Sequence, residues 1–198
     1  MRYPMHLQKL IQVLRKFPGV GTKSAERFAF QLLNWTENDL AEMSQVVGSI
    51  KEQLKQCDIC SCLTGEEGCL FCNDSTRNKN ILCIIASPKD VFAIEDTKEY
   101  RGLYHVLGHL LSPLDSKGPE HLSLTKLRER LVHQGVKEVI IALDSTIEGD
   151  VTSLYLKQEL GDLELNISRL AFGLPMGSSL DYVDGGTLAR AFSARGEF

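Results

Sequence analysis

Cys57-Asp58-Ile59-Cys60 and, eight residues later, Cys69-Leu70-Phe71-Cys72 form two Cys-x-x-Cys pairs. Each pair aims two sulfur atoms at one point, and four thiolates arranged in this way suit the tetrahedral coordination of Zn²⁺. The spacing therefore predicts a structural zinc site whose ligands are Cys57, Cys60, Cys69 and Cys72. A disulfide pair and a redox dithiol are the alternatives.

The expected compartment favours a metal over a disulfide. The 198-residue chain has no apolar run near the roughly 20 residues that a membrane span needs, and it opens on an amphipathic stretch rather than on a signal peptide. A cytoplasmic protein is therefore expected, and cytoplasmic thiols stay reduced. Cys62, two residues after Cys60, is a competing ligand, whereas Cys83 in the apolar run 81–85 is expected to be a buried core thiol.

Charge is divided unevenly along the chain. Residues 1–35 contain six basic residues and one acidic residue, a net charge of +5, and because the whole chain carries −4, the remaining 163 residues carry −9. Such asymmetry favours a polyanion as the partner of the N-terminal end and a different partner for the rest. The lysines and arginines after residue 100 are mostly interleaved with acidic residues, which is typical of a solvated surface.

Residues 5–16 and the residues from Thr22 onwards carry apolar side chains at helical spacing, which predicts two helices with Thr22 as the N-cap of the second. Between them stands Phe17-Pro18-Gly19-Val20-Gly21, so the segment has the form of a helix-hairpin-helix element. Gly19 and Gly21 let backbone amides approach a phosphate closely, and the helix N-terminus adds its partial positive charge.

Lys23 and Arg27 are four residues apart and are expected beside that phosphate. Such contacts reach the DNA backbone and not the bases, which gives little sequence preference and a strong dependence on salt. The alternative is an ordinary helical corner with solvated charges.

After the hairpin the chain changes its organisation. Residues 37–56 continue as a helix that leads to Cys57, and the polar segment 73–80 is a connection. From residue 81 strands alternate with helices, which predicts a parallel sheet with helices on both faces. The strands are expected at 81–85, 103–107, 139–143 and 165–170, the helices at 88–96, 122–132, 149–160 and 187–193, and a loop at 110–119.

Acidic residues follow the strand expected at 139–143, where Asp144, Glu148 and Asp150 lie near its carboxyl end. Ligands of such sheets bind at that edge, and three carboxylates can hold Mg²⁺ for phosphoryl transfer when another acid converges from a neighbouring strand. The strand at 81–85 runs into Ala86 and has no acid at its tip. An acidic rim that docks a basic partner is therefore favoured over catalysis.

Together these pieces resemble the RecR family of bacterial recombination mediators over nearly the whole chain. The hairpin and the cysteine quartet are common individually, but this order and spacing are highly specific. The likeness rests on residues 17–30, the quartet, and the segments 99–108, 111–115, 147–150 and 181–191.

The resemblance implies an α/β fold of four parts. These are an all-α helix-hairpin-helix module at 1–56, a four-cysteine zinc finger at 57–72, a Toprim-like parallel sheet at 80–173 and a C-terminal oligomerisation segment at 174–198.

The resemblance also implies a non-catalytic protein of recombinational DNA repair that binds single- and double-stranded DNA and forms dimers or ring-shaped tetramers. Members of the family work with RecO, and in some settings RecF, to help load RecA onto DNA covered by single-strand binding protein. Lys23 and Arg27 fall on the DNA-contacting positions of the family. The acidic side with Asp144, Glu148 and Asp150 is the region expected to face RecO.

The chain departs from the family pattern at the sheet edge. Ala86 stands where a Glu is usual, Asp144-Ser145 replaces a usual Asn-Pro, and Asp150 replaces a usual Glu. Catalytic Toprim enzymes carry that Glu together with an Asp-x-Asp on a later strand, and Thr146 occupies the second Asp position here. The alternative function, a Mg²⁺-dependent Toprim nuclease or topoisomerase-like enzyme, is weakened accordingly.

Overall fold

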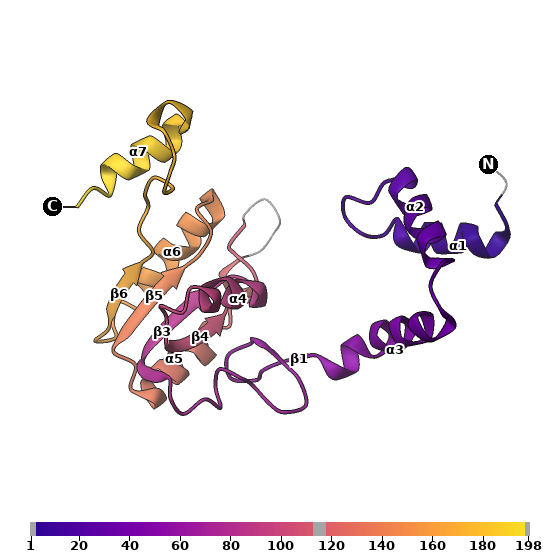
Figure 1. The fold of residues 1–198 in the computed structure, drawn as a ribbon. Coiled ribbons are helices and arrows are strands. Elements are labelled where there is room, and N and C mark those ends of the chain that lie inside the picture. Colours follow the sequence, from indigo (N-terminus) through magenta and orange to yellow (C-terminus); the bar gives the residue numbers. More distant parts are fainter. Residues whose placement is uncertain (1–2, 113–117, 197–198) are drawn as a thin grey trace. The chain divides into compact units, whose positions relative to one another are not determined.

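A computed structural model of the chain describes residues 3–112 and 118–196 (Figure 1). The chain divides into two compact units, Met1–Gln53 and Leu54–Phe198. Each unit has a hydrophobic core of its own.

The N-terminal unit consists of α1 (Met5–Leu14), α2 (Thr22–Leu32) and α3 (Glu37–Gln53). The apolar residues that recur at helical spacing in the first two helices meet in a small core. Ile11 and Leu14 of α1 are buried there against Ala25 and Ala29 of α2. The small alanine side chains let the two helices pack closely, and this packing fixes the hairpin between them.

α3 differs from α1 and α2 because all its residues lie exposed or only partly buried. One face of the helix is nevertheless apolar, with large side chains that remain 38–61% exposed, namely Leu40, Met43, Val46, Val47 and Ile50. The helix expected at 37–56 ends at Gln53. Lys55–Gln56 instead forms the short strand β1, which pairs antiparallel with β2 (Leu63–Thr64).

The second unit contains a four-stranded parallel sheet in the order β4-β3-β5-β6. The strands are β3 (Asn78–Ile85), β4 (Gly102–Val106), β5 (Glu138–Ala142) and β6 (Asn166–Arg169). The helices between them are α4 (Pro88–Asp96), α5 (Leu124–Gln134) and α6 (Ile147–Glu159), with a short 3-10 turn at Pro119–His121. The predicted fold, a Toprim-like sheet after a helical module and a cysteine cluster, is confirmed.

Helices cover both faces of this sheet because alternate strand residues point to opposite sides. Leu82 and Ile84 of β3 pack in one core with side chains of α5 and α6, such as Leu127 and Leu156. Cys83 and Ile85 belong to a second core, which they share with α4 and the cysteine segment.

The C-terminal part of the chain forms the 3-10 turn η2 (Leu180–Tyr182) and α7 (Gly185–Ser193). The Asp184 side chain caps α7 by accepting a hydrogen bond from the backbone N–H of Thr187. No helix within the described ranges is long and apolar enough to cross a membrane. Residues 113–117 of the loop expected at 110–119 lie outside the described part of the chain.

Candidate metal centre and nucleic-acid interface

The four predicted ligands come together in one cluster. The Sγ atoms of Cys57, Cys60, Cys69 and Cys72 all lie within 4.8 Å of one another. The sulfur atoms of Cys57 and Cys72 are 4.0 Å apart and those of Cys60 and Cys69 are 3.4 Å apart. Four sulfur atoms held at about 2.3 Å from one Zn²⁺ stand about 3.8 Å apart in a tetrahedron. The cluster therefore has the size that a tetrahedral four-thiolate site requires.

Two backbone turns aim these sulfur atoms. In the first turn Ser61 N–H donates to the carbonyl oxygen of Cys57, and Cys57 N–H donates to that of Cys62, both at 2.8 Å. Ser61 adopts a positive φ of 59° to close it. In the second turn Asn73 N–H donates to the carbonyl oxygen of Cys69 at 3.1 Å. The Cys-x-x-Cys spacing thus places both sulfur atoms of each pair on the same side of its turn.

The electrostatics of the cluster fit a bound cation. The pKa of Cys60 lies far below its ordinary value because the thiols of Cys62 and Cys72 donate hydrogen bonds to its sulfur. The pKa of Cys72 is raised by that hydrogen bond to Cys60 and by burial. Thiols this close cannot all ionise by themselves, whereas a divalent cation that binds four thiolates removes the repulsion. A donor set of sulfur alone fits Zn²⁺ and not Mg²⁺ or Ca²⁺.

The two remaining cysteines are not among the four whose sulfur atoms lie within 4.8 Å of one another. Cys62 is buried, and its Sγ lies 3.9 Å from the carbonyl oxygen of Cys60. Cys83 is 2% exposed in β3, and burial raises the pKa of its thiol to about 12. The expectation that Cys83 is a core thiol is therefore confirmed.

The cysteine segment covers an edge of the sheet. β4 is an edge strand, and Val106 N–H donates to the carbonyl oxygen of Cys60 at 2.9 Å. Phe71, which lies between two of the cysteines in sequence, packs edge-on against the ring of Tyr104 in the same strand. The cysteine cluster is thus attached to β4 by a backbone hydrogen bond and by the packing of two aromatic rings.

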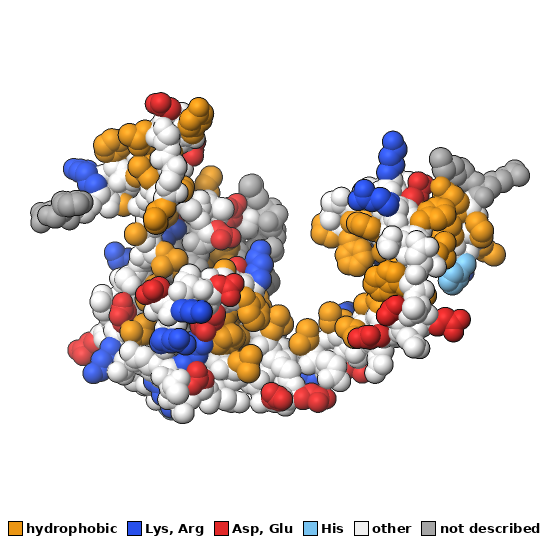
Figure 2. Space-filling view, in the orientation of Figure 1, with side chains coloured by type: hydrophobic (Ala, Val, Ile, Leu, Met, Phe, Trp, Pro, Cys, Tyr) orange, Lys and Arg blue, Asp and Glu red, His pale blue; other side chains and the backbone are white. Residues whose placement is uncertain are grey.

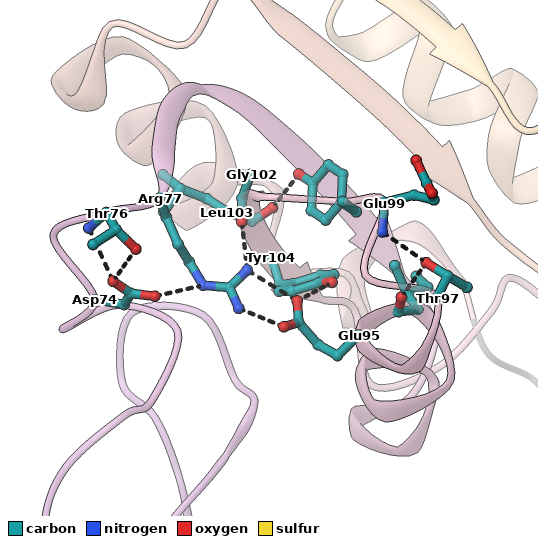
Figure 3. A network of polar contacts seen from close by, with 11 residues as sticks. Asp74, Thr76, Arg77, Glu95, Thr97, Glu99, Gly102, Leu103 and Tyr104 are labelled. Carbon is teal, nitrogen blue, oxygen red and sulfur yellow. Dashed lines mark hydrogen bonds and ion pairs between the residues drawn. The ribbon is translucent and has the colours of Figure 1, made fainter.

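A buried polar network strengthens this attachment (Figure 3). Arg77, just after the cysteine segment, donates two hydrogen bonds to the carboxylate of Glu95 in α4, at 2.9 and 2.7 Å. Arg77 also donates to the carbonyl oxygen of Gly102, and Tyr104 Oη donates to Glu95 at 2.6 Å. The guanidinium lies over the rings of Phe71 and Tyr104. Figure 3 shows Arg77, Glu95 and Tyr104 pointing toward one another from three segments of the chain.

The hairpin of the N-terminal unit has the geometry of an anion site. Gly19 has a φ of +77°, which favours glycine, and Val20 N–H closes the turn on the carbonyl oxygen of Phe17 at 3.1 Å. The N-cap of α2 is Gly21 and not Thr22, because the carbonyl oxygen of Gly21 accepts the first helical hydrogen bond, from Ala25 N–H. Gly21 makes no side-chain cap. The amides of the first turn therefore remain available to a phosphate.

Lys23 and Arg27 are both exposed on α2, one helical turn apart. Neither forms an ion pair with a residue in the described ranges, and Arg27 lies over the exposed ring of Phe28. Figure 2 shows Lys and Arg side chains gathered at one end of the N-terminal unit, beside exposed hydrophobic side chains. The four DNA-binding candidates, Gly19, Gly21, Lys23 and Arg27, thus belong to one hairpin and the start of one helix.

The three acidic residues at the edge of the sheet differ in exposure and in ion pairing. Asp144 is exposed and Glu148 is half-buried. Asp150 is bound by two arginines, at 2.6 Å from Arg169 Nη2 and at 2.8 Å from Arg190 Nη2. The hydrogen bond from Arg169 and the charges of both arginines lower the pKa of Asp150. Within the described part of the chain, the group of three or more residues placed to share a metal ion is the cysteine quartet and not these acids.

Sequence patterns missed the arginines that organise this unit. Arg130, Arg169 and Arg190 are among the basic residues expected on a solvated surface, yet Arg130 is buried, and Arg169 and Arg190 lie over the ring of Phe172 at 4.5 and 5.1 Å from its centre. Arg77, in the segment expected to be a polar connection, is buried as well. Their hydrogen bonds to Glu95, Cys72 and Asp150 span 18 to 58 residues of sequence, so local spacing carries no signal of these contacts.

Comparison with known proteins places the chain in a family. Residues 7–50 match the model "RecR, helix-hairpin-helix", residues 80–171 match the Toprim domain, and residues 173–195 match "RecR, C-terminal". The Recombination protein RecR of Protochlamydia amoebophila is 62% identical over 198 residues, which cover all of both chains. The chain belongs to the RecR family. The RecR proteins of Chlamydia pneumoniae and of Chlamydia trachomatis serovar D are 49% and 48% identical, over 98% and 100% of each chain.

Membership of the RecR family identifies a protein of recombination and repair. The matched RecR segments include the hairpin with Lys23 and Arg27, and also α7 with Arg190. The cysteine quartet lies between the first two matched ranges.

Proposed function

We propose that this RecR-family protein is a non-catalytic, cytoplasmic DNA clamp and adaptor. The observation that carries the proposal is the hairpin of the N-terminal unit, where a positive-φ glycine, an uncapped helix start and two exposed cations meet. Backbone amides and cations in this arrangement suit phosphate oxygens of single- and double-stranded DNA alike. Binding of this kind selects no base sequence.

Zn²⁺ is the proposed structural cofactor, one ion per chain, held by Cys57, Cys60, Cys69 and Cys72. A site with four protein ligands has no open position for water or substrate, so its contribution is to folding. Binding of Zn²⁺ can supply on the order of 10 kcal/mol to a segment too small to hold a core of its own. The sulfur geometry supports this assignment.

RecO is the proposed partner of the acidic edge, with RecF as a second partner and RecA and single-strand binding protein reached indirectly. Asp144, at the rim of the sheet, is exposed and able to meet a basic surface. Glu148 and Asp150 would contribute to the field there, although Asp150 is already neutralised by its two arginines. An oligomer, a dimer or a tetrameric ring, is proposed as the form that encloses DNA.

The Toprim enzyme alternative has less support. Two arginines hold Asp150 where a catalytic site would need a free carboxylate, and β3 ends at Ile85 and is followed by Ala86 instead of an acid. Cleavage of DNA by the pure protein with Mg²⁺, lost on Asp144→Ala, would favour that alternative.

The hairpin assignment is tested by titrating DNA at several salt concentrations with the double variant Lys23→Ala and Arg27→Ala. Each lost phosphate contact removes about 0.9 from the slope of log K against log salt on duplex DNA and about 0.7 on a single strand. We expect the slope to fall by roughly 1.8 and 1.4, and the affinity to fall about tenfold or more near 0.1 M salt.

The matched control is Lys89→Ala with Lys126→Ala. It removes the same charge from two exposed lysines of the second unit, so a general effect of net charge would appear there as well. An unchanged slope in the hairpin variant, or an equal change in the control, would refute the assignment.

A further inference from the structure

Arg130 is a buried cation, and its charge has no carboxylate partner among the residues that the structure describes. The residue lies on α5 and is 7% exposed. None of the acidic residues in the described ranges forms an ion pair with it, and the cavity of about 300 Å³ that it lines contains no acidic side chain from that part of the chain. A buried charge without a counter-charge is costly, so an anion is expected nearby.

The neighbours of Arg130 identify this anion. Its guanidinium donates to the carbonyl oxygen of Tyr104 and to Oε1 of Gln134, and it meets Nδ1 of His105 at 3.5 Å. These groups are uncharged: burial, and then the charge of Arg130, lower the pKa of His105 to about 4, so the imidazole is neutral at pH 7. The fourth neighbour is Cys72, whose Sγ lies 4.0 Å from Nη2.

We propose that Arg130 is the counter-charge and hydrogen-bond donor of the four-cysteine metal centre, acting through the Cys72 thiolate. One divalent ion with four thiolates carries a net charge of −2, which the buried guanidinium partly balances. The inference rests on the proposed zinc binding and adds to it a positioning residue from the far side of the sheet. Groups that hydrogen-bond to metal ligands orient them, and their loss commonly costs 10- to 100-fold in metal affinity.

Through Arg130, α5 directly contacts one of the four cysteines of the proposed metal centre. Arg130 and Cys72 are 58 residues apart in sequence, and α5 packs on the face of the sheet opposite α4 and the cysteine segment. The guanidinium reaches round the edge strand β4, where it also binds the Tyr104 carbonyl oxygen. Metal binding and the seating of α5 on the sheet are therefore coupled through one side chain.

The test measures zinc affinity of the full chain by competition with a chromophoric chelator, for wild type, Arg130→Gln and Arg130→Lys. Gln removes the charge and keeps a donor for the Tyr104 carbonyl oxygen, so we expect zinc binding 10- to 100-fold weaker. Lys keeps the charge and should stay within about threefold of wild type. With Co²⁺ in place of zinc, Arg130→Gln should shift the sulfur-to-metal charge-transfer band to longer wavelength, because the thiolate loses a donor.

Arg128→Gln is the matched control, since Arg128 lies on the same helix and pairs with Asp162 at the surface. The inference would be overturned if Arg130→Gln had the same zinc affinity and the same cobalt spectrum as the wild type. Should Arg130→Gln fail to fold, a loss of tenfold or more in Arg130→Lys would overturn it as well. A wild-type protein that binds no zinc would refute the proposed metal site itself, which is a separate result.

Discussion

Arg77 and Arg130, the buried arginines of the described part of the chain, differ in how their charge is balanced. Arg77 has the carboxylate of Glu95 in a two-bond contact, with Asp74 3.6 Å away, whereas Arg130 has no ion pair with any acidic residue that the structure describes. Burial alone would raise the pKa of Glu95, but the hydrogen bonds from Arg77 and Tyr104 outweigh it and lower that pKa. Both arginines donate hydrogen bonds to carbonyl oxygens of the edge strand β4, beside the cysteine segment. The balance of charge around each guanidinium therefore affects how stably that segment is bound to the sheet.

Glu95→Gln should destabilise the second unit by about 2–3 kcal/mol at pH 7, because the substitution leaves the buried guanidinium with only the longer ion pair to Asp74, at 3.6 Å. A carboxyl whose pKa is lowered on folding stabilises the fold above its unfolded pKa of about 4.3, and this contribution is lost as pH falls through the lower folded value. The gap between wild type and variant in urea unfolding should therefore narrow below about pH 4.

Glu99→Gln is the control for this measurement, since Glu99 lies near the network without an ion pair to any described residue. A gap that stays constant from pH 7 to pH 3 would show that the charge of Glu95 is not what stabilises the network.

At the scale of elements, regular periodicity was a good guide to the structure. The four strands and the helices α1, α2, α4, α5, α6 and α7 lie within a few residues of their expected positions. All of these except α7, which buries no residue, have an apolar pattern that faces a core. The predicted end of α3, at residue 56, was wrong. Lys55–Gln56 pairs with Leu63–Thr64 instead, and this contact lies outside the local sequence pattern. The cysteine cluster was predictable because its spacing alone brings sulfur atoms together.

The attachment of α7 was not predictable from pattern. α7 is held to the sheet by Arg190, which binds Asp150 and Oγ of Ser145 and lies over Phe172. Asp150 thereby joins three elements, α6, β6 and α7, because Arg169 shares the same carboxylate. These contacts link residues 18 to 45 positions apart.

Asp150→Asn should release α7 while leaving the sheet intact. The ion pairs are partly exposed, so each contributes no more than about 1 kcal/mol, and the melting temperature should change little. Backbone hydrogen exchange in Gly185–Ser193 should accelerate several-fold, because this helix depends on the contact. Asp162→Asn, which breaks the pair with Arg128 instead, should leave exchange in α7 unchanged, and equal acceleration in both variants would contradict the assignment.

At the scale of the whole molecule, both units expose large apolar side chains that a partner chain could bury. Leu40, Val47 and Ile50 of α3 stand 39–59% exposed in one row, and in the second unit Met176, Tyr182 and Phe192 are 68–102% exposed. A row of exposed apolar side chains on one helix, as on α3, marks an interaction site. This surface supports the proposed oligomer, whereas its stoichiometry does not follow from a single chain.

Light scattering or native mass spectrometry, with and without DNA, should therefore find a dimer or tetramer. Val47→Glu places a charge in the middle of the apolar row of α3 and should shift the mass toward smaller species, because burying an unpaired carboxylate costs several kcal/mol. Gln45→Glu adds the same charge to the other side of the helix and should leave the mass unchanged. A wild-type protein that stays monomeric under all these conditions would contradict the clamp, because one chain cannot close around DNA, and the hairpin would then act as a simple DNA-binding module.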